Sequence, residues 1–234
     1  MQEQLSSKTE VAHFDNLAHD YKATHDRAIK LAGGDSDFFY KSKINHLESL
    51  LDMVPRRILD YGGGTGRLTK LLHSHYDKSD IVLYDPSKES IEVAKHECKS
   101  DDRLTIISEG LEEQEPFDLV VAAGVFHHIP RKYELDNLKV LYNLLNPGGK
   151  VVVFEHNPVC PHAQLLIALA GLDKDATFIR AGSMKKMMSQ VGFTKPISKY
   201  ISFLPSSFTL LHPLETWLDW FPLGAQYVAM ASKN

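Results

Sequence analysis

The sequence has few cysteines and no long apolar run. Only Cys98 and Cys160 occur in 234 residues, which is too few for a disulfide framework, and a reducing cytosol is the simplest compartment for such a chain. The longest apolar stretch, residues 163–172, is shorter than the roughly 18 residues of a membrane span. The first ten residues lack the basic-then-apolar layout of a secretion signal. We therefore expect a cytoplasmic protein without stable membrane insertion.

The sequence also lacks a basic stripe and a metal-ligand motif. Its 26 Lys and Arg against 30 Asp and Glu give a net charge of −4, which argues against nucleic acid as a partner. The 12 histidines show no H-E-x-x-H or comparable spacing, so we expect no metal site. Hydrophobic residues make up 43% of the chain, enough for the core of one large domain.

Short apolar strands alternate with helical patterns along most of the chain. Pro55 is expected to stop a helix over residues 39–54, and Ser183 is expected to cap a helix over 184–192. The pattern is typical of a doubly wound, mainly parallel α/β sheet with helices on both faces. The predicted strands lie at residues 57–62, 81–85, 103–108, 117–124, 150–156, 194–205 and 226–233, and further helices at 68–72, 87–99, 133–145 and 160–172.

Two segments fall outside this alternation. Residues 1–38 form a polar arm that we expect to cover the cofactor or the substrate, ahead of a domain over residues 39–234. Residues 206–224 form an apolar insert before the last strand, broken by prolines into short pieces. The insert either packs on the sheet edge, forms a dimer contact, or acts as a lid over the acceptor. Its Trp217 and Trp220 are expected to pack rather than to form a cage.

A glycine-rich loop, "DYGGGTGR", follows the first predicted strand. Ligands of open α/β sheets bind beyond the carboxyl ends of the strands, where this loop lies. The G-x-G-x-x-G spacing of dinucleotide sites fits poorly, because the third glycine position is occupied by Arg67 or Thr69. The spacing that is present is D-x-G-x-G-x-G, formed by Asp60, Gly62, Gly64 and Gly66.

This loop resembles motif I of class I S-adenosylmethionine-dependent methyltransferases. The resemblance extends over residues 14–155, through "FDLVVAAGVFHHI" and "LLNPGGKVVVFE". It implies a seven-stranded Rossmann-like methyltransferase fold and S-adenosyl-L-methionine as cofactor. The glycine loop would surround the methionine end of the cofactor, and Asp60 would help hold its amino group. The other residues that the resemblance assigns to the cofactor are Tyr21, Asp85 (ribose), Glu109 (adenine), Gly110, Leu111 and Ala123.

Other interpretations of these residues stay open. Asp85 is also a good candidate for capping the next helix, Glu109 for a solvated loop, and Tyr21 for core packing. Of the adjacent His127 and His128, one usually packs, and either is a candidate for touching substrate.

The resemblance implies methyl transfer to an oxygen or nitrogen nucleophile of a small-molecule acceptor. A base is needed only for a hydroxyl or a protonated amine. The candidates are His156 and Glu155, after the fifth strand, and His128. The "EHNP" and "PLGAQY" stretches resemble a bacterial subset associated with saccharide or lipid-linked substrates; an apolar insert also suits an aromatic acceptor. The alternatives are a non-catalytic cofactor-binding protein and an NAD-type oxidoreductase; a homodimer is a further expectation.

Overall fold

The computed structural model describes residues 36–98, 101–161, 163–165, 176–204, 208, 215 and 217–234. Tyr21 and nearly all of the predicted arm lie outside these residues, as do parts of the predicted helix over 160–172 and of the insert. None of the helices among the described residues is long and apolar enough to cross a membrane.

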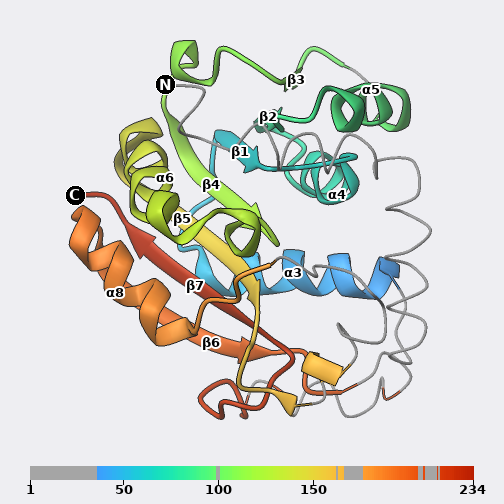
Figure 1. The fold of residues 1–234 in the computed structure, drawn as a ribbon. Helices are drawn as coiled ribbons and strands as arrows, with labels where there is room; N and C mark the ends of the chain where they lie inside the picture. The colour runs from blue at the N-terminus through green and yellow to red at the C-terminus, as the bar shows by residue number, and fades with distance from the viewer. Residues whose placement is uncertain are drawn as a thin grey trace.

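The described residues form one seven-stranded sheet with the strand order β3-β2-β1-β4-β5-β7-β6 (Figure 1). The first five strands run parallel, and β7 runs antiparallel between β5 and β6. The predicted doubly wound sheet is therefore confirmed. The strands are β1 (Arg57–Tyr61), β2 (Asp80–Tyr84), β3 (Leu104–Ile107), β4 (Phe117–Ala123), β5 (Leu145–His156), β6 (Thr194–Ile201) and β7 (Gln226–Ser232).

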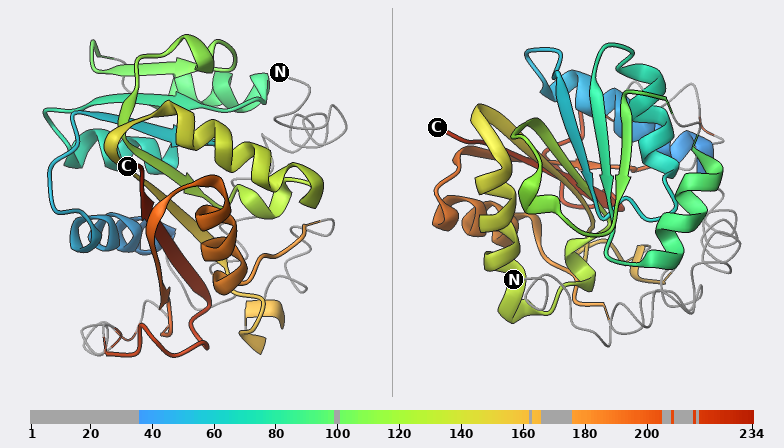
Figure 2. Two further views of the ribbon diagram at one scale, coloured as in Figure 1. Left: turned by 90° about the vertical axis from the view of Figure 1, so that its left-hand side faces the viewer. Right: turned by 90° about the horizontal axis from the view of Figure 1, so that it is seen from above.

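Helices cover both faces of the sheet. Those on one face are α3 (Ser36–Leu50), α4 (Arg67–His75) and α5 (Lys88–Glu97); those on the other are α6 (Arg131–Leu144) and α8 (Ala181–Val191) (Figure 2). Successive strand residues point to opposite faces, so each parallel strand contributes side chains to two hydrophobic cores, one on each face of the sheet. In β4, Val120 belongs to the core under α6 and α8, and Val121 to the core under α3 and α4.

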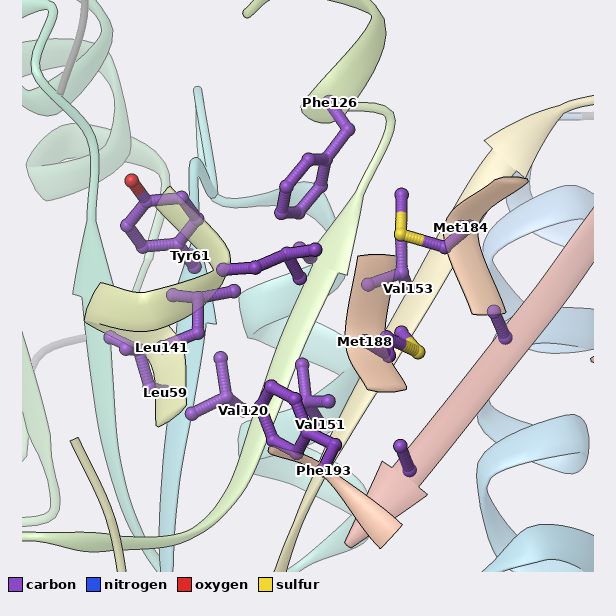
Figure 3. Packing of buried hydrophobic residues seen from close by; sticks show 14 of the residues in the cluster. Leu59, Tyr61, Val120, Phe126, Leu141, Val151, Val153, Met184, Met188 and Phe193 are labelled. Atoms are coloured by element: carbon purple, nitrogen blue, oxygen red, sulfur yellow. The ribbon is translucent and has the colours of Figure 1, made fainter. Parts of the chain in front are cut away.

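The core under α6 and α8 is built from helix residues that meet small and branched strand residues. Figure 3 shows Met184 and Met188 of α8 on the side of Val153, and Leu141 of α6 on the side of Val120. All five side chains are fully buried. Unbranched methionine fills irregular gaps in such a core, and this packing fixes the carboxyl ends of β4 and β5 relative to each other.

Several predicted boundaries are wrong for local reasons. The helix before β1 ends at Leu50 rather than at Val54, well ahead of Pro55. The predicted cap at Ser183 lies inside α8, whose N-cap is Arg180. The "NPGG" run does not separate α6 from the fifth strand, because β5 begins at Leu145. Leu145 pairs with Phe117, and the register between β4 and β5 shifts before Leu119 pairs with Lys150.

Candidate active site at the carboxyl edge of the sheet

The glycine loop lies between β1 and α4 and is held against the end of β2. The backbone N–H groups of Gly62 and Gly63 both donate to the Tyr84 carbonyl, at 2.8 and 3.1 Å. Gly62, Gly64 and Gly66 all have positive φ, at 70°, 54° and 80°, a region that favours glycine. The loop therefore has a backbone conformation in which any residue other than glycine would be strained.

The three predicted cofactor glycines differ in what surrounds them. A Cβ on Gly62 would lie 2.7 Å from a methyl group of Val125, and one on Gly66 would lie 2.5 Å from Cys98 Sγ. A Cβ on Gly64 would meet nothing within 4 Å. Gly62 and Gly66 are thus needed for packing, whereas Gly64 turns its bare backbone toward open space. That is the arrangement expected where a ligand approaches the chain.

Asp60, the next-to-last residue of β1, is a buried carboxyl group beneath this loop. Its side chain is 1% exposed, and its Oδ2 accepts a hydrogen bond from Thr69 Oγ1 at 2.6 Å. Burial raises the pKa of Asp60 to about 7, and the nearby charge of Asp85 adds to the rise. A cationic ligand group beside Asp60 would reverse this effect and favour the ionised form.

Asp85 follows β2 and joins two loops. Its Oδ2 accepts from the Gly64 N–H at 2.8 Å, and its Oδ1 accepts from the Ser87 N–H at 2.9 Å. The helix-capping interpretation of Asp85 is wrong, because Ser87 is the N-cap of α5 and accepts from the Ser90 N–H at 3.1 Å. Asp85 instead connects the glycine loop to the loop after β2.

The predicted adenine-side residues follow β3. Glu109 is exposed and forms an ion pair with Lys88 at 3.2 Å. Gly110 has a φ of 72°, and Leu111, which starts the short helix η1 (Leu111–Glu113), is fully buried. Backbone groups after β3 therefore have a fixed position at the carboxyl edge, while the Glu109 side chain lies in solvent.

A cluster of a carboxylate and histidines occupies the carboxyl ends of β4 and β5. Glu155 is 1% exposed, and its Oε1 accepts from the Val125 and Phe126 N–H groups at 3.0 and 2.7 Å. Its Oε2 lies 2.6 Å from Nδ1 of His127, which is also buried. An ionised carboxylate only accepts, so His127 donates its Nδ1–H and Glu155 fixes the ring and its tautomer.

The other two histidines surround His127. The His127 ring centroid lies 4.0 Å from that of His128 and 5.3 Å from that of His156, and both of these rings are half-buried. Phe178 completes the group, with its ring centroid 5.5 Å from that of His127 and 5.8 Å from that of His156. The structure thus brings the three predicted catalytic residues Glu155, His128 and His156 together around His127.

His127 was predicted as one of two adjacent histidines, either of which is a candidate for touching substrate, but its contact with Glu155 was not predicted. Two further residues at this edge were not predicted. Asn157, which is buried, donates to the carbonyls of Pro222 and Gly224 at 3.1 and 2.8 Å, which ties the segment after β5 to the insert. Lys43 of α3 is also buried and donates to Gln226 Oε1 at 3.0 Å. No sequence signal marks these last two contacts.

The exposed end of the insert corrects one prediction. Trp217 and Trp220 are 79% and 71% exposed, so neither packs on the sheet. The Trp220 indole N–H donates to the Trp217 carbonyl at 3.0 Å, and Asp219 forms an ion pair with Lys199 of β6 at 2.9 Å. The insert is thereby attached to the sheet while presenting its indoles outward.

These residues fit the cofactor that the glycine loop indicates. The backbone at Gly64 faces open space, and the buried Asp60 carboxyl lies beneath the loop, where a cationic group would favour its ionised form. No group of three or more His, Cys, Asp and Glu residues is placed to hold a metal ion within the described residues.

Comparison with known proteins agrees with this geometry. Residues 37–196 match the family model described as a methyltransferase domain, so the chain belongs to this family. Its fold is the Rossmann-like fold of class I methyltransferases, and the cofactor of this class is S-adenosylmethionine. Among solved structures, a Thermotoga maritima methyltransferase described as a possible histamine N-methyltransferase has a TM-score of 0.68 at 18% identity, covering 94% of this chain and 98% of that one.

Curated relatives match over part of their length. An uncharacterized methyltransferase of Staphylococcus carnosus is 27% identical over 146 residues, which are 61% of this chain and 65% of that protein. A malonyl-[acyl-carrier protein] O-methyltransferase of Priestia megaterium is 31% identical over 112 residues, which are 47% of this chain and 40% of that protein. Both matches span less than two thirds of the relative.

Proposed function

We propose that the protein transfers a methyl group from S-adenosylmethionine, in line, to an oxygen or nitrogen nucleophile of a small-molecule acceptor. The observation that carries the proposal is the arrangement at the carboxyl edge of the sheet. The open backbone at Gly64 lies with Asp60 and Asp85 at the ends of β1 and β2, and the histidine cluster lies at the ends of β4 and β5. One edge thus offers a cofactor half and an acceptor half.

In the cofactor half, we assign the predicted residues to separate parts of the cofactor. Asp60 and the loop from Gly62 to Gly66 hold the methionine end, and Asp85 accepts from the ribose hydroxyls, as a carboxylate can from two adjacent donors. Asp85 already fixes the Gly64 N–H, so ribose binding and loop shape depend on the same side chain. Glu109, Gly110, Leu111 and Ala123 are assigned to the adenine side, and Tyr21 to a covering arm.

In the acceptor half, the half-buried histidines are the groups placed to meet an acceptor. When bound, S-adenosylmethionine supplies an already activated methyl group, so the protein mainly orients the nucleophile and excludes water. We assign His156 and His128 to orienting the acceptor or taking its proton. Glu155 is a positioning residue, because its two oxygens hold the loop after β4 and His127.

For the acceptor, we propose a small molecule with an apolar part, either aromatic or attached to a saccharide or lipid carrier. The exposed indoles of Trp217 and Trp220 and the attachment of the insert to the segment after β5 support this choice. The related proteins named above have names that refer to both oxygen and nitrogen methylation. A cytoplasmic location and a homodimer remain part of the proposal.

The experiment is mass spectrometry of a cell extract incubated with the protein and methyl-labelled S-adenosylmethionine. We expect a labelled small molecule that is absent when His156→Asn replaces the wild type, while calorimetry shows nearly unchanged cofactor affinity for that variant. Cofactor binding without any labelled product would favour a non-catalytic binding protein. Binding of NAD in place of S-adenosylmethionine would favour an oxidoreductase.

A further inference from the structure

Lys43 of α3 is a charged side chain placed inside the protein. It is 3% exposed, and its Nζ donates to Gln226 Oε1 at 3.0 Å. The ammonium lies 3.5 Å from the ring centroid of Phe39 and 5.4 Å from that of Phe154. Within the part of the chain that the structure describes, its direct contacts are one neutral amide oxygen and aromatic faces, which attract a cation but do not neutralise it.

A buried lysine normally has a carboxylate partner. Among the described residues, Glu155 raises the pKa of Lys43 through its charge, but no ion pair joins the two side chains. Burial is the larger influence and lowers the pKa of Lys43 to about 7. Glu155 is in turn engaged by two backbone N–H groups and by His127. Among the described residues, Lys43 is therefore a buried amine without a carboxylate in contact, and an anion beside it would favour its protonated form.

The position of Lys43 connects it with the acceptor half. Gln226, its hydrogen-bond partner, is the first residue of β7 and lies opposite His156 in the β5–β7 ladder. Phe154 lies two residues before His156 in β5 and therefore on the same face of the sheet. Its ring lies beside the ammonium of Lys43. Lys43 thus lies at the end of β5 and the start of β7, beside the strand residues that precede and face His156.

We propose that Lys43 binds an anionic group of the methyl acceptor, a carboxylate or a phosphate. This proposal rests on the proposed function and adds the charge of the acceptor to it. The anion replaces the Phe39 ring over the ammonium and supplies the missing counter-ion. A charge-assisted hydrogen bond in such dry surroundings is stronger than one between neutral groups, so it would favour acidic acceptors over neutral ones.

The test uses malonate and inorganic phosphate as probes and neutral malonamide as the control. The full chain is studied in the presence of S-adenosylhomocysteine, and all samples have the same ionic strength. Thermal unfolding reports binding. We expect malonate or phosphate to raise the melting temperature of the wild type, and malonamide to have no effect. In Lys43→Met and Lys43→Gln, the apparent affinity for the active anion should fall by roughly tenfold or more. In Phe39→Ala, which uncovers the ammonium, it should increase.

Each outcome has a definite meaning. A response to malonate identifies the carboxylate form of the site, and a response to phosphate alone identifies the phosphate form; both support the proposal. An equal response in Lys43→Met, no response in the wild type, or failure of both Lys43 variants to fold would overturn it. Calorimetry with S-adenosylmethionine separates the two claims: if the wild type binds the cofactor but neither anion, only the Lys43 proposal fails.

Discussion

At the scale of single residues, the site depends on buried carboxyl groups whose surroundings differ. Asp60 has one hydroxyl donor, Thr69, and a pKa raised to about 7 by burial. Glu155 has two backbone donors and an imidazole. The number of donors decides how well each carboxylate tolerates its charge inside the protein. Asp60 is therefore poised to ionise when a cation approaches, and Glu155 is a fixed hydrogen-bond acceptor.

Asp60→Asn should change how stability depends on pH. The pKa of Asp60 is 3.8 when unfolded and about 7 when folded, so the folded state binds more protons between these values. Its contribution is fully present below pH 4 and is lost as the pH rises through about 7. Without cofactor, the variant should therefore gain stability relative to the wild type from pH 4 to pH 8, by on the order of a few kcal/mol. Urea unfolding at several pH values measures this.

A constant stability difference between the two proteins across that range would contradict the assignment. Thr69→Val is the matched control, since it removes the hydrogen bond to Asp60 and leaves the carboxyl group to titrate.

Glu155→Gln should separate positioning from folding. The glutamine oxygen can still accept from Val125 and Phe126, but its amide group donates toward His127 Nδ1 and imposes the opposite tautomer. We expect a folded protein with near-normal cofactor affinity and turnover reduced by roughly 10²-fold or more, the range for general acid–base catalysis. Nitrogen NMR of the histidine rings reports the tautomer directly. Unchanged turnover with a changed tautomer would remove the His127–Glu155 pair from the reaction.

At the scale of elements, the glycine loop combines packing and binding positions in five residues. Gly66 is the N-cap of α4 and has a left-handed backbone conformation, and it packs against Cys98, the residue after α5. Gly64, in contrast, faces open space. Two substitutions in one loop should therefore fail in different ways.

Gly64→Asn should fold and lose cofactor binding, because asparagine tolerates positive φ and its side chain would extend into the open space. Gly66→Ala should instead destabilise the fold by about 1–3 kcal/mol, since its Cβ would lie 2.5 Å from Cys98 Sγ at a φ of 80°. Thermal unfolding and calorimetry of both variants check this. If Gly64→Asn bound the cofactor normally, the loop would be a turn and no more.

The elements were predictable where the signal is local. The apolar runs predicted all seven strands, because strands buried on both faces need continuous apolar residues. The loop spacing predicted a glycine turn between the first strand and the next helix, and Gly62, Gly64 and Gly66 have positive φ there. The start of β5 was misplaced, because "NPGG" joins the sheet through the Leu145–Phe117 pair, a tertiary contact that overrides the turn signal. The contact of Lys43 with Gln226 joins residues 183 positions apart, and no periodicity reports it.

At the scale of the whole molecule, hydrogen bonds link the carboxyl edge of the sheet to the described part of the insert. Asn157 donates to the carbonyls of Pro222 and Gly224, so the residue directly after His156 is tied to the end of the insert. The charges Asp219 and Glu215 are engaged with Lys199 and with the Leu204 N–H. What the described residues of the insert present outward is therefore mainly apolar.

Replacing Trp217 and Trp220 together with alanine should leave the fold intact, because both side chains are mostly exposed. If the insert contacts the acceptor, cofactor affinity and melting temperature should persist while KM for the acceptor rises by roughly tenfold. Calorimetry, thermal unfolding and steady-state kinetics measure these quantities. Conversion of a dimer to a monomer in size-exclusion chromatography would instead identify the indoles as an interface between copies.

The measurement that tests the central claim most directly is calorimetric titration of the wild-type protein with S-adenosylmethionine, and separately with NAD. The account predicts one S-adenosylmethionine per chain, no heat of binding for NAD, and loss of binding in Gly64→Asn. Binding of NAD, or no binding of S-adenosylmethionine by the folded wild type, would contradict it.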